Sequence, residues 1–396
     1  MTDGYCCGCG ACAGALGTGD VVMRLSAQGQ LRPTLLAPLP APAASKFGQV
    51  CPGVNVRLEP TTAGAPERAW GPIVRLRAGH AVDPEFRRLG SSGGAVSALA
   101  MHLLETGQVD FVAQIAVSAD DPLRNDVQQS TCRADVLRAA GSRYAPAAPL
   151  ERLGEFLDSG RRFAVIGKPC DVAAVRNLAR VDPRVERQIP FLISFMCAGV
   201  PSLEGTLELL RAMGMARSEL RSFRYRSDGW PGMARAVSQD DRVAEMDYAG
   251  SWGRVLNRHL QFRCKICPDG TGETADVVCA DAWYGVDGYP DFAERDGRSL
   301  VIARTARGEA LVSEALQRSV LVADNLDVGE LARMQPYQLA RKQLVLARLL
   351  GTWLRRGWVP RYRGLRLLAC ARQANPIEWL RNAVGTWRRA VGEEAP

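Results

Sequence analysis

The stretch RRFAVIGKPCDVAAVRNLAR (residues 161–180) decides the expected fold. It begins with a short apolar run of the kind that forms a buried strand. The tight turn GKP follows, and the spacing of apolar residues after it predicts a helix. Strand, turn and helix in this order form the repeating unit of an α/β protein.

The flanking sequence continues this pattern. Apolar or alternating runs predict strands at residues 72–79, 109–118 and 189–197. Helices are predicted at 91–107, after a glycine turn, and at 202–214, where Ser202 is the expected N-cap. Residues 220–250 predict short antiparallel strands, so the expected class is mixed α/β (α+β). We expect the Pro/Ala-rich stretch LLAPLPAPAASKFGQVCPG (35–53) to be a linker or surface loop without regular structure.

Composition restricts the class of protein. The chain has 396 residues, of which 47% are hydrophobic and 23% charged, which suits one large core or two and excludes disorder. No apolar run reaches the about 18 residues of a membrane span, and the chain begins without a signal-peptide pattern. We therefore expect a cytoplasmic protein with reduced thiols. Its 12 cysteines are clustered, which favours metal ligation over disulfides.

The first cysteine cluster lies at the start of the chain. Cys6, Cys9 and Cys12 have the C-x2-C-x2-C spacing of ferredoxins, whose further cysteine precedes a proline, as Cys51 does here. Zinc sites more often show cysteine pairs or cysteines with histidines. The spacing therefore favours an iron–sulfur cluster with Cys51 as a remote fourth ligand. Cys7 either replaces Cys6 as a ligand or is a spare thiol.

A second cysteine pair, Cys264-x-x-Cys267, is half of a metal site and needs two further ligands. The best candidates for these ligands are Cys170 and Cys197. Cys170 follows a predicted strand and begins a helix, where the helix N-terminus stabilises a thiolate. Cys197 ends the next predicted strand, so both sulfur atoms can meet at one edge of the sheet. The alternative for Cys170 and Cys197 is a buried, purely structural role.

Two glycine turns, GSSGGAVSAL (90–99) and IGKPCDVAAV (166–175), lead into helices. Backbone amides at such turns bind anions, typically phosphate. Neither turn is a G-x-G-x-x-G motif or a P-loop. Beside iron–sulfur sites they are candidates for binding a flavin pyrophosphate, with Lys168 as a point charge. No Ser/His/Asp or paired-carboxylate pattern stands out, so catalytic residues are not assigned.

The positive charge is concentrated near the C-terminus. Residues 341–390 contain 12 Lys/Arg and one acid, although the whole chain carries only +8. Arginines alternate there with Trp and Tyr, a composition that suits peripheral contact with an anionic membrane. The alternative is a set of helices packed on the body with a solvated arginine face. Because no nucleic-acid-binding fold accompanies the segment, we expect no nucleic-acid partner.

Seven segments together resemble a known family. They are CCGCGACAG (6–14), RLGSSGGAVSALAMHLLETGQVDFV (88–112), GSRYAPA (141–147), FAVIGKPCDVAAVRNLA (163–179), FMCAGVPSLEGTLELL (195–210), FRYRSDGWPG (223–232) and CKICPDGTGETADVVCADAW (264–283). In this order they are similar to the coenzyme F-420 hydrogenase/dehydrogenase beta-subunit family, which includes deazaflavin-reducing subunits and chlorophyll-pathway reductases. The chain differs from the family in its long segment before Cys51, in Cys279-Ala280 where Val-Gly is usual, and in its arginine-rich C-terminus.

The resemblance implies bound FAD and one or two 4Fe–4S clusters. It implies that the central cluster is held by Cys170, Cys197, Cys264 and Cys267. The implied flavin contacts are Ser91, Ser92, Gly93, Gly94, Ser142, Tyr144, Gly167, Lys168 and Asp281. The implied domains are a cysteine-rich iron–sulfur segment (1–60), a family N-terminal domain (70–150), a flavin and iron–sulfur domain (151–335) and a basic helical tail (336–396).

FAD handles hydrides and single electrons, whereas iron–sulfur clusters pass only single electrons. We therefore predict an oxidoreductase that passes electrons between 4Fe–4S clusters and FAD, with an organic substrate or a deazaflavin such as coenzyme F-420 at the flavin. The expected electron partner is a ferredoxin-like donor or a reduced cofactor. The substrate is expected to be small or lipid-linked, and the location cytoplasmic or peripheral to the inner membrane.

Other functions stay open. One is an electron-transfer beta subunit of a larger hydrogenase/dehydrogenase complex, and another is a reductase of a pigment or polysaccharide pathway. A zinc-stabilised binding protein is a further alternative. The sequence sets neither the substrate nor the oligomeric state.

Overall fold

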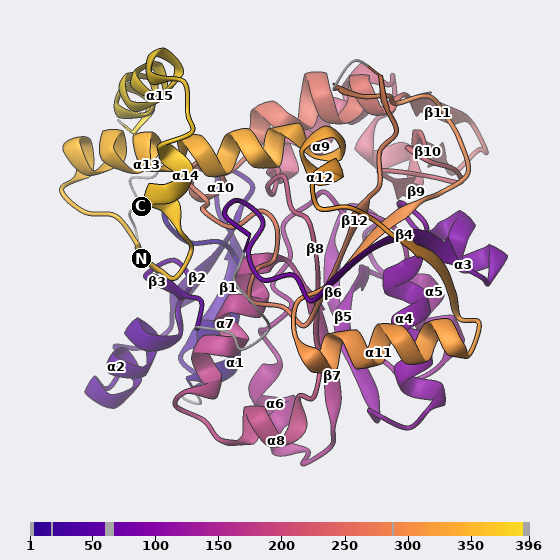
Figure 1. Ribbon diagram of the computed structural model, residues 1–396, viewed down its shortest axis with the longest axis horizontal. Coiled ribbons are helices and arrows are strands. Elements are labelled where there is room, and N and C mark those ends of the chain that lie inside the picture. The colour runs from indigo at the N-terminus through magenta and orange to yellow at the C-terminus, as the bar shows by residue number, and fades with distance from the viewer. Residues whose placement is uncertain (1–3, 17–18, 60–66, 287–288, 391–396) are drawn as a thin grey trace.

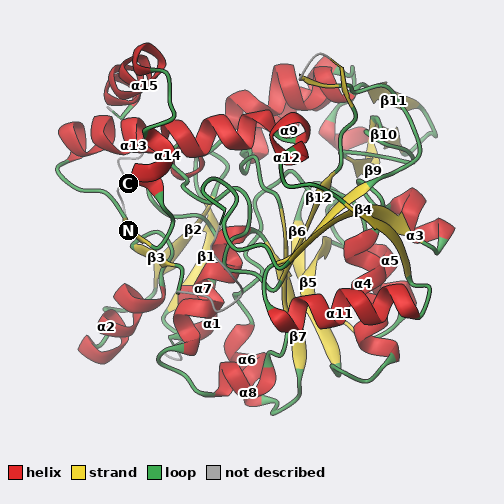
Figure 2. Ribbon diagram, viewed as in Figure 1, coloured by secondary structure: helices red, strands yellow, loops and turns green. Residues whose placement is uncertain are grey.

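The computed structural model describes residues 4–16, 19–59, 67–286 and 289–390. An eight-stranded sheet crosses the protein, with helices on both of its faces (Figures 1 and 2). In spatial order its strands are β16 (Leu321–Asn325), β4 (Arg75–Ala81), β15 (Ser299–Ala303), β12 (Val277–Asp281), β8 (Leu192–Phe195), β7 (Phe163–Gly167), β5 (Phe111–Val117) and β6 (Asn125–Ser130). The inner pairs β12–β8, β8–β7 and β7–β5 are parallel and the outer pairs antiparallel. The mixed α/β class is confirmed.

The inner strands are apolar on both sides because helices cover both faces. All five residues of β7 are buried. Phe163 and Val165 pack toward α1 (Ala11–Ala15), α6 (Leu153–Asp158), α7 (Pro169–Ala179) and α8 (Arg184–Gln188). Ala164 and Ile166 pack toward α3 (Pro84–Leu89), α4 (Ala95–Glu105), α5 (Arg133–Arg138) and α11 (Ala306–Gln317). The predicted strand–turn–helix at 161–180 is therefore β7 followed by α7.

A second, antiparallel sheet contains β9 (Leu220–Arg224), β10 (Ala234–Ser238) and β11 (Val243–Met246), as expected for residues 220–250. It shares an apolar core with α9 (Leu203–Ala212). Ser202 caps α9 as predicted, because its side chain accepts a hydrogen bond from the Gly205 amide. The remaining short elements are α10 (Phe262–Lys265), β13 (Gly285–Val286), β14 (Tyr289–Pro290), α12 (Glu330–Met334) and short stretches of 3₁₀- or π-helix at 217–219, 249–255 and 256–259.

The expectation of an irregular loop at residues 35–53 is wrong. This stretch contains α2 (Ala41–Val50), and Leu35 ends the hairpin of β1 (Val21–Leu25) and β2 (Leu31–Leu35). Pro42 lies in the first turn of α2, where the missing N–H costs no helical hydrogen bond. Alanines supply the helix propensity that the proline count obscured. The helix ends at Cys51, whose amide donates to the Phe47 carbonyl at 2.9 Å.

The two ends of the chain pack together. β3 (Asn55–Arg57) pairs in parallel with β17 (Arg361–Arg363), and the Tyr5 hydroxyl donates to the Trp358 carbonyl at 2.8 Å. The C-terminal segment forms α13 (Pro336–Arg356), α14 (Leu367–Ala371) and α15 (Pro376–Arg389), which lie on the same side of the molecule as β3 (Figure 1). α13 buries Leu344, Val345, Ala347 and Leu349 against the body. Among the described residues, no helix is both long and apolar enough to cross a bilayer.

A buried ion cluster joins the C-terminal segment to the rest of the chain. The Glu273 carboxylate is fully buried and contacts both Lys342 of α13 and Arg366. The Lys342 ammonium also donates to the Pro268 carbonyl at 2.9 Å. The loop after Cys267 and the C-terminal helices are therefore coupled through charges that lie away from water.

We predict that Glu273→Ala lowers the free energy of unfolding by about 3–5 kcal/mol, because it leaves Lys342 buried without a counter-charge. Chemical denaturation measures the change. Glu245→Ala is the matched control, since it removes an exposed pair with Arg235 and is expected to cost no more than about 1 kcal/mol. Equal losses in the two variants would contradict this role of Glu273.

Candidate functional site

The carboxyl ends of the parallel strands meet at one edge of the sheet. Lys168 and Cys170 follow β7, Cys197 follows β8, and Asp281 ends β12. A cleft of about 220 Å³ opens there, as ligand sites do in open α/β sheets. Parallel pairing thus brings together residues that are far apart in the sequence.

Most of the predicted flavin contacts line this cleft. They are Ser91, Ser92, Gly94, Ser142, Tyr144, Gly167, Lys168 and Asp281. Gly93 does not line it, because its amide is turned to the Ser299 hydroxyl, at 2.8 Å. The Ser142 amide donates to the Ser91 hydroxyl, so the SSGG and GSRY loops are in contact. The structure therefore places all three predicted loops around one space.

The N-terminus of α4 offers backbone amides to this cleft. Residues 94–97 line it, and no side chain caps the helix. Gly94 has φ +73°, and a Cβ there would lie 2.2 Å from the Phe86 carbonyl oxygen, so only glycine fits. Uncapped amides at the positive end of a helix favour an anionic group.

The second helix N-terminus at the cleft, that of α7, is closed by its own side chains. The Asp171 carboxylate accepts from the Lys168 amide and pairs with the Lys168 ammonium, both at 2.8 Å. Burial opposes the charged form of Lys168, but the negative charge of Asp171 outweighs it, and the pKa of Lys168 is raised. Burial also raises the pKa of Asp171, against the effect of Lys168. Lys168 is therefore a charged donor, and one of its hydrogen bonds is already made to Asp171.

Sequence reasoning missed several residues that line the cleft or contact its lining. The buried Arg226 guanidinium binds the Asp281 carboxylate through two hydrogen bonds of 3.1 and 2.9 Å. Trp230 donates its indole N–H to the same carboxylate at 2.7 Å. Both residues belong to FRYRSDGWPG, a segment that carried the resemblance but gave no assigned contact. Tyr248, Trp252 and Tyr337 add aromatic surface to the cleft, and no sequence pattern marked them.

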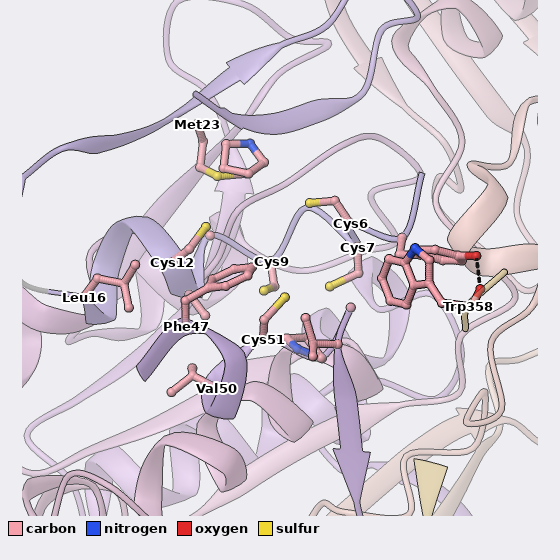
Figure 3. Close-up of a pocket in the computed structure, with 17 residues that line it drawn as sticks. Cys6, Cys7, Cys9, Cys12, Leu16, Met23, Phe47, Val50, Cys51 and Trp358 are labelled. Atoms are coloured by element: carbon pink, nitrogen blue, oxygen red, sulfur yellow. Dashed lines mark hydrogen bonds between the residues drawn. The ribbon is translucent and has the colours of Figure 1, made fainter. Parts of the chain in front are cut away.

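The N-terminal cysteine group (Cys6, Cys9, Cys12 and Cys51) lines a second, apolar cavity (Figure 3). Cys12 lies in α1, and Cys51 directly follows the last residue of α2. The Gly8 amide donates to the Cys6 sulfur at 3.3 Å. Burial raises the pKa of Cys12 to about 12 and that of Cys51 to about 11. As thiolates, these side chains would need a cationic centre between them.

Cys7 also lines this cavity, and its thiol lies close enough to that of Cys170 for each to change the pKa of the other. Cys170 belongs with Cys197, Cys264 and Cys267, which we call the central cysteine group. Cys197 interacts electrostatically with all three other members. Burial raises the pKa of Cys264, and the Val200 amide donates to its sulfur at 3.4 Å. Cys7 therefore connects the two groups.

The helix α13 covers the central cysteine group. Arg341 donates to the carbonyls of Cys197 and Cys264, at 2.9 and 3.2 Å. Gln338 donates to the Cys197 carbonyl at 3.2 Å. The positive charge of Arg341 lowers the pKa values of both thiols, although burial raises them on balance. The charge of this segment therefore contributes to the site.

The donor sets fit iron–sulfur clusters. Each group offers four thiols in a buried space, with backbone amides directed at sulfur, and such hydrogen bonds tune cluster potentials. Within the described part of the chain, no three His, Cys, Asp or Glu side chains are placed to hold a single metal ion. The ligands of a cluster bind different iron atoms and lie farther apart than those of one zinc ion. The remaining cysteines, Cys132, Cys279 and Cys370, belong to neither group.

Comparison with known proteins identifies the family. Two profiles describe the N- and C-terminal parts of the "Coenzyme F420 hydrogenase/dehydrogenase, beta subunit", and they match residues 77–153 and 160–328, respectively. The chain belongs to this family. Both profiles end before α13, so the C-terminal helices lie outside the matched residues.

Individual family members are distant in sequence. The coenzyme F420 hydrogenase subunit beta of Methanococcus voltae is 25% identical over 290 residues, which cover 68% of this chain and 94% of that protein. The coenzyme F420-dependent sulfite reductase of Methanocaldococcus jannaschii is 24% identical over 267 residues, and the match spans only 38% of that protein. The family members found are thus named as oxidoreductases or their subunits.

The fold is shared with a solved structure. A chain of the F420-reducing [NiFe] hydrogenase complex from Methanosarcina barkeri superimposes with a TM-score of 0.54 at 20% identity. The match covers 71% of this chain and 96% of that chain. At this identity the likeness concerns the fold.

We predict that Lys168→Met lowers the free energy of unfolding by about 3–5 kcal/mol, because Asp171 is left buried and unpaired. The double variant Lys168→Met/Asp171→Asn should recover most of this loss, since the amide oxygen still caps α7. Urea denaturation compares the two. If the double variant is no more stable than the single one, the loss does not come from an unpaired Asp171.

Proposed function

We propose that the chain is an oxidoreductase subunit that binds FAD in the cleft and a 4Fe–4S cluster at each cysteine group. One observation carries the proposal: Cys197 belongs to the central cysteine group and also lines the cleft. An iron–sulfur cluster bound by Cys197 would therefore lie next to a flavin bound in the cleft. Bound FAD supplies the conversion between hydride and single-electron transfer.

The lining residues suit the parts of FAD. The α4 N-terminus and the Lys168 ammonium would bind the pyrophosphate, since Asp171 uses only one of the three Lys168 donors. Tyr248, Trp252 and Tyr337 would cover the ring system and exclude water. Arg226 holds the Asp281 carboxylate in place beside them.

The cysteine groups suit a linear path for electrons. The N-terminal cysteine group connects through the Cys7–Cys170 contact to the central cysteine group, which borders the cleft. Arg341 would favour the reduced state of a central cluster, because its positive charge offsets the added electron. Electrons could pass along this path in either direction.

The comparisons support a narrower form of the proposal. A relative matched over 94% of its length is named a beta subunit of coenzyme F420 hydrogenase. We infer that the hydride partner at the flavin is a deazaflavin of this kind, and that electrons enter or leave through another protein. An electron-transfer subunit without its own substrate is the second candidate, since the named relatives include subunits of complexes.

One assay separates the two candidates. The purified chain is incubated anaerobically with reduced coenzyme F-420 and a viologen dye. Dye reduction by the chain alone supports a complete hydride-oxidising site. Dye reduction that requires an added partner subunit supports the electron-transfer candidate.

We predict that Cys264→Ala and Cys267→Ala each remove about half of the iron and acid-labile sulfide of the wild type, because three thiolates hold a cluster poorly. Cys132→Ala, which alters an exposed cysteine of neither group, should keep the full content. Chemical analysis after anaerobic purification gives the numbers. Unchanged iron content in both the Cys264→Ala and the Cys267→Ala variant, or zinc in place of iron, would refute the central cluster.

We predict that Lys168→Met/Asp171→Asn weakens FAD binding by roughly 1.5–3 kcal/mol, because a charge-assisted hydrogen bond to phosphate is lost. Flavin fluorescence during dilution measures retention. Arg187→Gln, which removes an exposed cation from α8, serves as the control. If the double variant and the control retain FAD equally, Lys168 does not contact the phosphates.

A further inference from the structure

The helix α15 presents an apolar stripe to solvent. Ile377, Leu380, Val384 and Trp387 recur at the spacing of one helix face and are 70%, 61%, 41% and 43% exposed. Ala383, Thr386 and Ala390 lie on the neighbouring face and are buried. The stripe is therefore not the surface by which α15 packs on the body.

α15 is fixed in place by close contact with α13. A Cβ on Gly351 of α13 would lie 2.2 Å from the Ala383 carbonyl oxygen, so the helices cross with almost no space between them. Arg348 donates to the Asn382 side chain at 3.0 Å, and Arg356 donates to the Ala390 carbonyl at 3.1 Å. α13 adds exposed apolar side chains of its own, Trp353 and Leu354.

The cations of this segment divide into two sets. Arg341, Lys342, Arg348, Arg356 and Arg366 make the internal contacts described above. Arg355, Arg361, Arg363, Arg372, Arg381, Arg388 and Arg389 are exposed, and none forms an ion pair with a described residue. Arg381 and Arg388 follow Ile377 by four and eleven positions, so they border the apolar stripe.

We propose that the stripe and the two arginines that border it, Arg381 and Arg388, together called the α15 face, dock the protein on an anionic lipid surface. An apolar stripe bordered by arginines, with tryptophan at the boundary, matches the requirements of a helix lying in the membrane interface. In the described part of residues 341–390 the only acid is Glu378, so the face complements anionic headgroups. The face also lies outside the residues that match the family profiles.

Liposome co-sedimentation of the full chain tests this proposal. One set of vesicles contains phosphatidylglycerol mixed with phosphatidylcholine, and the other contains phosphatidylcholine alone. The stripe variant is Ile377→Gln/Leu380→Gln, and the charge variant is Arg381→Gln/Arg388→Gln. The matched control, Arg187→Gln/Arg211→Gln, removes two exposed cations from α8 and α9.

The wild type and the control should bind the phosphatidylglycerol vesicles and not the neutral ones. The affinity of the stripe variant and that of the charge variant for these vesicles should each fall at least about tenfold. Circular dichroism confirms that the variants are folded, which the exposure of all four side chains leads us to expect. This outcome does not depend on FAD or iron content, so it is independent of the proposed function.

Three results would overturn the proposal. One is wild-type protein that does not bind phosphatidylglycerol vesicles, and another is a stripe variant that binds as the wild type does. The third is a concentration-dependent dimer in sedimentation velocity that the stripe variant abolishes without any vesicle binding, which would make the α15 face an interface between two copies of the chain.

Discussion

Parallel pairing of β7, β8 and β12 is the constraint on which the candidate site depends. Because three strands end at the same edge, Lys168, Cys197 and Asp281 meet although more than a hundred residues separate the first from the last. Each strand leads directly into a turn whose side chains or amides face the cleft. Most residues of these strands are buried, because helices cover both faces of the sheet.

The two ends of the chain complete the site from outside the family domains. α2 positions Cys51, β3 pairs with β17, and α13 covers the central cysteine group through Arg341. The buried Glu273 contacts close this arrangement with charges that are costly to separate. The cations of this segment thus divide into an internal set, of which Arg341 contacts the central cysteine group, and an exposed set, two members of which border the stripe of the α15 face.

The elements around β7 could be predicted from the sequence because their apolar runs and glycine turns are local signals. The spacing of Cys6, Cys9 and Cys12 and of the Cys264–Cys267 pair could be read from the sequence because it is typical of metal ligation, whereas Cys170 and Cys197 were added from the ends of predicted strands and from the family resemblance. That each cysteine group holds a cluster stays a prediction. α2 was missed because its prolines suggested a loop, although Pro42 lies in the one turn that tolerates it. Arg226 and Tyr337 were missed because their role depends on tertiary contacts that no local pattern encodes. The Lys168–Asp171 pair was also missed, because the sequence analysis gave Lys168 a role without considering the carboxylate three residues later.

The proposed function requires single-electron groups and a two-electron flavin at adjacent sites in one chain. An anaerobic reductive titration with dithionite, followed by absorption and electron paramagnetic resonance, tests this requirement most directly. We expect uptake of about four electrons per chain, two by FAD and one by each cluster, with a resonance from reduced iron–sulfur centres. Uptake of only two electrons with a flavin spectrum, or no uptake by a zinc-containing protein, would contradict it.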